Sequence, residues 1–223
     1  MKLKAEIDSF NFMNNHLESY FNNEDYIIET IKSVGVFNHK IWLNTFHKPL
    51  TKNIVEAKIL HTSTGLQVPI KRFSRSQDKQ TLELAGLHGY NDRSKLLNRL
   101  FDDIKDDIQN EIITRLDVAI DFKGKIPNKV IKKLCEDRTL FTYRNTTYYK
   151  SESEKKCNNR LNIKTYNKSK MNNILEETIY RLEFSFLNSY IQKIKVKDFQ
   201  ILCKKMEKTI KRFSGLLVQI PIL

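Results

Sequence analysis

The stretch Thr114-Arg-Leu-Asp-Val-Ala-Ile-Asp-Phe122 decides the fold. Its apolar and charged residues alternate with a period of two, which predicts a β-strand with one buried face. Aspartate is depleted in strands. Asp117 and Asp121, on the open face, therefore predict a functional use for that face.

Two later stretches, 161–168 and 180–186, show the same alternation. If the three strands are neighbours in one sheet, their polar faces form a single site. That site combines carboxylates that suit Mg²⁺ or Mn²⁺, cations that suit phosphate, and one phenol. The residues left on the polar faces of the two later strands are Lys164, Tyr166 and Lys168, and Arg181, Glu183 and Ser185.

This combination favours metal-assisted attack on a phosphodiester. A phenol with a pKa of about 10 is a poor nucleophile at neutral pH, but a metal or a lysine can stabilise its anion. Asp117 and Asp121 lie four residues apart, roughly 13 Å along a strand, so they cannot both bind one ion without a bulge. One of them is expected to join Glu183, with a slight preference for Asp117. The alternative is an internal salt-bridge network that includes Arg115 and Arg181.

Composition points to a polyanionic partner. The 223 residues include 39 Lys and Arg against 26 Asp and Glu, a formal charge of +13. Nucleic acid is the first candidate and an anionic membrane the second; the charge could also reflect AT-rich coding DNA. The three cysteines are far apart, so a zinc ribbon and a disulfide scaffold are both unexpected, and a reducing cytoplasm fits. A signal peptide, a membrane span, a P-loop and a serine-hydrolase motif are not expected.

The rest of the chain predicts an α+β fold. Residues 1–25 suggest a polar leader with one helix, followed by a β-rich part at 26–90 and an αβ part at 91–223. Strands are expected at 27–31, 41–46, 54–60, 66–72, 80–85, 140–143 and 146–150, and helices at 92–108, 127–135 and 199–213. The last helix is basic on its outer side, includes Lys204 and Lys208, and can end at Gly215.

Five motifs then follow one another along the chain. They are Leu82-Glu-Leu-Ala-Gly-Leu-His-Gly89, Thr114-Arg-Leu-Asp-Val-Ala-Ile-Asp121, Thr147-Tyr-Tyr-Lys-Ser-Glu-Ser153, Ile163-Lys-Thr-Tyr-Asn-Lys168 and Tyr180-Arg-Leu-Glu-Phe184. Their order resembles the replication initiation factor family, which includes rolling-circle initiators of small plasmids and filamentous phages. One departure is Lys150, where that family usually has glycine.

The resemblance implies a metal-dependent enzyme, topoisomerase-like in that it nicks and rejoins DNA at a replication origin. Residues 26–223 would form its nicking domain, with antiparallel sheets, helices packed on one face, and a distant likeness to the histidine-motif nickase fold. Tyr166 would become linked to the 5′ end of the cut strand, and Lys168 would contact phosphate or stabilise the phenolate. Asp117, Asp121 and Glu183 would hold Mg²⁺ or Mn²⁺.

The resemblance also implies further candidate residues and several partners. Tyr148, Tyr149, Tyr143 and Tyr180 are rival nucleophiles. Alternation places Tyr180 on the apolar face, which disfavours it, whereas Tyr148 and Tyr149 stay open. His88 in its Gly-flanked turn is an accessory candidate. Single-stranded or hairpin origin DNA, a host helicase and a second copy of the chain are the implied partners. The alternative is a non-catalytic DNA-binding regulator of the same descent. The expected DNA contacts are Arg115, Lys164, Arg181, Lys204 and Lys208.

Overall fold

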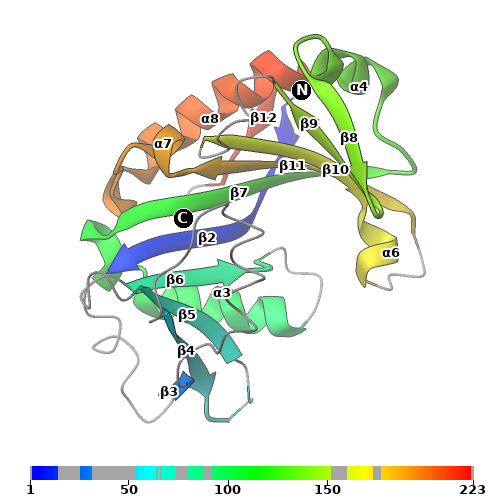
Figure 1. Cartoon of the computed structure of the whole chain (residues 1–223). Coiled ribbons are helices and arrows are strands. Elements are labelled where there is room, and N and C mark those ends of the chain that lie inside the picture. Colours follow the sequence, from blue (N-terminus) through cyan, green and yellow to red (C-terminus); the bar gives the residue numbers. More distant parts are fainter. Residues whose placement is uncertain are drawn as a thin grey trace. The chain divides into compact units, whose positions relative to one another are not determined.

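The computed structural model of the protein forms two compact units (Figure 1). One unit contains residues 1–10 and 113–223, and the other contains residues 11–112. The expected strand at 41–46 and the turn at His88 lie outside the described residues. The structure describes residues 2–14, 26–31, 54–63, 65, 67–73, 80–87, 92–151, 160–172 and 177–221.

The first unit is built on an antiparallel sheet. Its strands lie in the order β7-β11-β10-β9-β8, and β2 (Glu6–Asn14) lies beside β7. The three strands with period-two alternation are therefore consecutive in one sheet, which meets the condition for a single site. The strand bounds are β7 Ile112–Lys123, β8 Thr139–Tyr143, β9 Thr146–Lys150, β10 Leu161–Asn167 and β11 Ile179–Leu187.

Helices cover the apolar face of this sheet. Phe186 of β11 packs its ring 4.7 Å from that of Tyr190, centroid to centroid, and the Tyr190 hydroxyl donates a 3.0 Å hydrogen bond to the Lys205 carbonyl. The final helix therefore lies on the Phe186 side of the sheet (Figure 1), and the opposite face is left for the polar residues. The helices of this unit are α4 (Asn128–Cys135), α6 (Lys168–Asn172), α7 (Asn188–Ile191), η2 (Val196–Asp198) and α8 (Phe199–Ser214).

The ends of the first unit are tied together. Gly215 stops α8 in the left-handed region at φ 72°, which a residue without a Cβ adopts readily. The chain then returns as β12 (Val218–Gln219), which pairs in parallel with β1 (Leu3–Lys4).

The second unit combines an antiparallel meander with one long helix. Its strands lie in the order β3-β4-β5-β6 and confirm the predicted strands near 27, 54, 66 and 80. Leu97 and Leu100 of α3 are buried, as expected from the helical stripe. The bounds are β3 Tyr26–Ile31, β4 Ile54–His61, β5 Gln67–Phe73, β6 Gln80–Ala85, α3 Asp92–Ile104 and η1 Asp107–Asn110.

The expected α+β class is confirmed, but the amino-terminal prediction needs correction. Residues 6–14 form β2, a strand, where a leader with a helix was expected. Phe10 and Phe12 are fully buried, so this segment is part of the core. The polar, Asn-rich composition of residues 1–25 suggested a leader; the structure pairs two of its acidic residues, Glu6 and Asp8, with Arg181.

Candidate active site

Strand register gathers the predicted polar residues on one surface, which we call the polar face. Arg181 of β11 lies opposite Asp121 on one side and Tyr166 on the other. Glu183 lies opposite Ala119 and Lys164, and Ser185 lies opposite Asp117. The polar face is thus made of Arg115, Asp117, Asp121, Lys164, Tyr166, Arg181, Glu183 and Ser185.

The Tyr166 phenol lies at the centre of the polar face. Its hydroxyl donates a 2.9 Å hydrogen bond to Oε2 of Glu183, and the residue is only 8% exposed. Burial raises the pKa of Tyr166 above its ordinary value, and the Glu183 charge raises it further. The phenol is therefore neutral, with its proton directed at a carboxylate.

Glu183 is held by several partners. Oε1 forms a 2.8 Å ion pair with the Lys164 ammonium and accepts a 3.4 Å hydrogen bond from the Ser185 hydroxyl. The Lys164 ammonium also lies 5.5 Å from the centre of the Tyr166 ring. Burial raises the pKa of Glu183; Lys164 opposes that shift, and the charge of Asp117 adds to it. Glu183 is therefore a stronger base than an exposed glutamate.

Asp117 forms one end of the polar face. It is buried, and Arg115 holds it through two hydrogen bonds: Nε to Oδ1 at 2.9 Å and Nη2 to Oδ2 at 2.6 Å. The Arg115 side chain is 36% exposed. The partner of this buried carboxylate is therefore in contact with solvent.

Asp121 forms the other end of the polar face, where it binds the fully buried Arg181. Arg181 is 0% exposed and donates from Nε and Nη2 to the two Asp121 oxygens at 2.6 and 2.7 Å. Nη1 also pairs with Asp8, and Nη2 lies 3.5 Å from Glu6 Oε2. Sequence reasoning missed Glu6 and Asp8, although Glu6-Ile-Asp8 carries a short alternation that could have indicated a strand.

Lys168 lies close to this second end. Its ammonium is 3.8 Å from Asp8 Oδ1, and its side chain is buried. Burial lowers the pKa of Lys168, and the Arg181 charge lowers it further. Lys168 follows β10 directly, so the strand that carries Tyr166 also brings this lysine to the site.

The three predicted metal ligands do not meet at one point. Within the described parts of the chain, no group of three or more His, Cys, Asp or Glu side chains could hold a metal ion. Asp117 and Glu183 are close enough for the charge of one to raise the pKa of the other. Because Mg²⁺ is usually bound through one or two carboxylates together with waters and substrate phosphates, this pair is compatible with it.

The rival tyrosines separate by face. Tyr149 is buried and bonds to Thr165 on the other side of the sheet, and its pKa is raised by burial. Tyr180 pairs with Phe122, also off the polar face. Tyr148 pairs with Lys164, so it shares the polar face with Tyr166.

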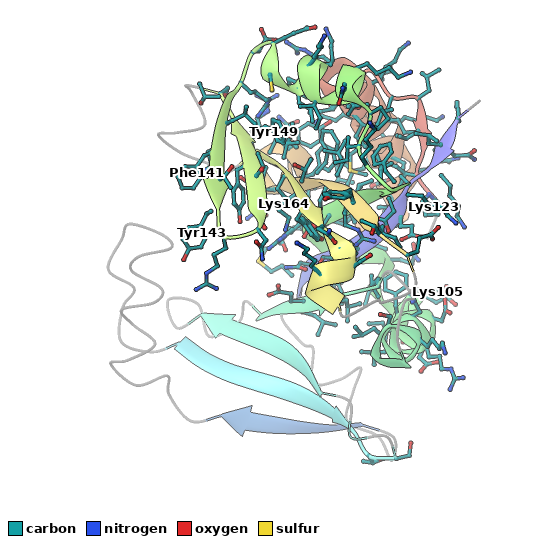
Figure 2. All side chains as sticks on the ribbon, turned by 90° about the vertical axis from the view of Figure 1, so that its right-hand side faces the viewer. Lys105, Lys123, Phe141, Tyr143, Tyr149 and Lys164 are labelled. Carbon is teal, nitrogen blue, oxygen red and sulfur yellow. The ribbon has the colours of Figure 1, made fainter. Side chains whose placement is uncertain are left out.

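The predicted DNA-binding residues also lie on both sides of the sheet. Lys164 lies opposite Tyr148 of β9, so its side chain reaches the polar face beside the β8–β9 hairpin (Figure 2). Arg115 and Arg181 are held by carboxylates on that face. Lys204 and Lys208 are exposed on α8, which covers the opposite face of the sheet. These two lysines therefore do not lie beside Tyr166.

Comparisons with known proteins give a likeness in structure and none in sequence. No family model matches the chain, and no curated protein matches it. Among solved structures, the chain is similar to a rolling circle replication initiator protein from Geobacillus stearothermophilus, with a TM-score of 0.49 and 13% identity over 95% of this chain and 85% of that one. A likeness of this size does not bear on activity. No helix in the described residues is long and apolar enough to cross a membrane.

Proposed function

We propose that the chain is a DNA nicking and joining enzyme in which Tyr166 is the nucleophile. One observation carries the proposal: a buried phenol donates its proton to a buried carboxylate on a face rich in cations. A nucleophile within hydrogen-bond reach of a general base is the recurring arrangement of covalent catalysis. The order of the five sequence motifs supports a rolling-circle replication initiator as the setting.

In the proposed reaction, Glu183 Oε2 takes the phenolic proton as the Tyr166 oxygen attacks the phosphorus of a DNA phosphodiester. The bond from phosphorus to the 3′ oxygen breaks. The 5′ phosphate stays on Tyr166, and the 3′ oxygen leaves as a hydroxyl after it gains a proton from Lys168 or water. Reversal of these steps rejoins the strand, because the phosphotyrosine bond retains the energy of the bond that was cut.

Because the pKa of Tyr166 is raised, the base has to remove the phenolic proton during the attack itself. A free phenolate is unfavourable in this buried position, so the proton has to leave as the new bond forms. The raised pKa of Glu183 suits it to accept that proton. Lys168, whose lowered pKa reflects burial, suits proton donation on the other side of the reaction.

Metal dependence is a further part of the proposal. Asp117 and Glu183 would hold a Mg²⁺ or Mn²⁺ ion, which would stabilise negative charge on the phosphoryl group. Asp121 was also predicted as a ligand. Both aspartates are held through both oxygens, but Arg115 is 36% exposed whereas Arg181 is fully buried, so we assign the metal to the Asp117 end.

A second candidate is a DNA-binding regulator without catalysis. The ion pairing of Asp117, Asp121 and Glu183 favours it, since a fully paired polar face needs no substrate to be stable. The formal charge of +13 suits both candidates.

A covalent-adduct assay separates the two. The full chain is incubated with Mn²⁺ and supercoiled DNA that carries the origin of the replicon encoding it. We expect nicked circles and a protein–DNA adduct, and we expect Tyr166→Phe to form neither while Tyr148→Phe forms both. An adduct that persists in Tyr166→Phe would contradict the assignment of the nucleophile. No adduct in any variant, with DNA binding intact, would favour the regulator.

A further inference from the structure

The hairpin of β8 and β9 extends the polar face with aromatic side chains. Tyr143 lies opposite Thr146, which lies opposite Tyr166. In the next row, Phe141 lies opposite Tyr148, which lies opposite Lys164. Two strand spacings separate Tyr143 from Tyr166, about 10 Å. The candidate nucleophile and the aromatic hairpin therefore occupy one continuous surface.

The aromatic side chains of β8 are open to solvent. Phe141 and Tyr143 are each 55% exposed, and every residue of β8 is exposed. Figure 2 shows both side chains on the β8–β9 hairpin. The rings of Phe141 and Tyr148 lie 6.3 Å apart between centroids, so two aromatic side chains from adjacent strands form one platform.

The hairpin carries only positive charge, which favours an anionic ligand. Residues 139–150 include Arg144 and Lys150 and no acidic residue. The Arg144 guanidinium lies 5.4 Å from the centre of the Tyr143 ring, and Arg144 sits in the turn at a positive φ of 52°. The turn therefore places a guanidinium beside the exposed Tyr143 ring.

Aromatic rings beside cations are the recurring surface for single-stranded nucleic acid. Every base has a π-face that can stack on an exposed ring, while the cations follow the phosphates. In duplex DNA the bases are already stacked on one another, so their faces are closed to Phe141 and Tyr143. We propose that Phe141, Tyr143 and Tyr148 form a base-stacking platform that holds single-stranded DNA next to Tyr166.

This inference rests on the proposed function and names its substrate as single-stranded DNA. A separation of about 10 Å is spanned by about three nucleotides at the 3.4 Å rise of a duplex, and by fewer in an extended single strand. The stacked bases would therefore lie within a few nucleotides of the phosphate that Tyr166 attacks, and they would fix which phosphate is presented.

The test measures binding of a fluorescein-labelled oligo(dT) to the full chain, without metal, so that no cleavage occurs. We expect Phe141→Ala and Tyr143→Ala each to weaken binding by roughly 5- to 100-fold. Leu140→Ala is the matched control, because Leu140 is 56% exposed on the same strand but points to the other face. It should bind as the natural chain does.

A second variant tests stacking itself. Phe141→Trp should retain binding, and its added indole fluorescence should be quenched by oligo(dT) and not by duplex DNA. Unchanged affinity in both alanine variants would overturn the proposal. Equal losses in Leu140→Ala would overturn it too, in favour of a general effect on the hairpin. If the two alanine variants keep their DNA affinity but no longer self-associate as the natural chain does, the surface would be reassigned to a second copy of the chain.

The two proposals fail separately. Covalent adducts that form with unaltered oligo(dT) affinity in the alanine variants would overturn the platform and leave the nuclease. Stacking without any adduct would overturn the nuclease and leave the platform.

Discussion

Each end of the polar face contains an arginine–aspartate ion pair, and the two pairs differ in how far the arginine is exposed to solvent. At one end Arg181 is fully buried and contacts Asp121, Asp8 and Glu6. At the other, Arg115 binds the buried Asp117 and is itself 36% exposed. An arginine locked by several acids supports the fold, whereas one that reaches solvent can release its carboxylate to a substrate or a metal.

The largest expected effect lies between the two ends, at Glu183. Glu183→Gln removes the proton acceptor of Tyr166, and we expect nicking to fall by about 10²–10⁴-fold, the usual contribution of a general base. The raised pKa of Glu183 fixes the sign of the pH dependence. Activity should be lost as pH falls, because a protonated Glu183 can neither accept the phenolic proton nor bind the cation.

The pH–rate profile checks this role. The acidic limb should be present in the natural chain and missing from the residual activity of Glu183→Gln. An unchanged limb in that variant would assign the titration to another group. Ser185→Ala is the matched control, since it removes only a 3.4 Å hydrogen bond to the same carboxylate.

The next effect compares the two arginines by stability. Arg181→Met leaves three neighbouring, partly exposed carboxylates without the fully buried arginine that holds them together, and we expect it to lower the free energy of unfolding by about 3–5 kcal/mol. Arg115→Met should lower it by about 1–3 kcal/mol, and Mn²⁺ should recover part of that loss by binding the released Asp117. Urea unfolding with and without Mn²⁺ measures both. Equal losses, or Mn²⁺ recovery in Arg181→Met only, would break the distinction between the ends.

The smallest effect compares the two aspartates as metal ligands. Asp117→Asn should weaken Mn²⁺ binding by at least about tenfold, while Asp121→Asn should leave it unchanged. Isothermal titration of the DNA-free chain with Mn²⁺ is independent of catalysis. A larger loss in Asp121→Asn would move the metal to the Arg181 end.

Much of the polar face was predictable from the chain alone. The alternation around Asp117, Tyr166 and Glu183 identified three strands and their faces, and the structure places these strands side by side. That was possible because a period of two fixes which side chains share a face. The α+β class and the basic final helix followed from equally local patterns.

The remaining features depend on contacts between distant segments. Asp8 joins Arg181 from 173 residues away, and no local pattern announces such a pairing. The separation of Lys204 and Lys208 from Tyr166 depends on which face α8 covers, and the exposure of Phe141 depends on where the sheet ends. The sequence raised an internal salt-bridge network as an alternative but could not show that each acid of the polar face has a basic partner.

The most direct test of the account is the site of the covalent bond. The protein–DNA adduct is digested with protease and nuclease, and the modified peptide is identified by mass spectrometry. The account predicts a nucleotide 5′-phosphate on Tyr166, in the peptide that carries Lys168. A phosphotyrosine on Tyr148 or Tyr143, or nicking that leaves no covalent adduct, would contradict it.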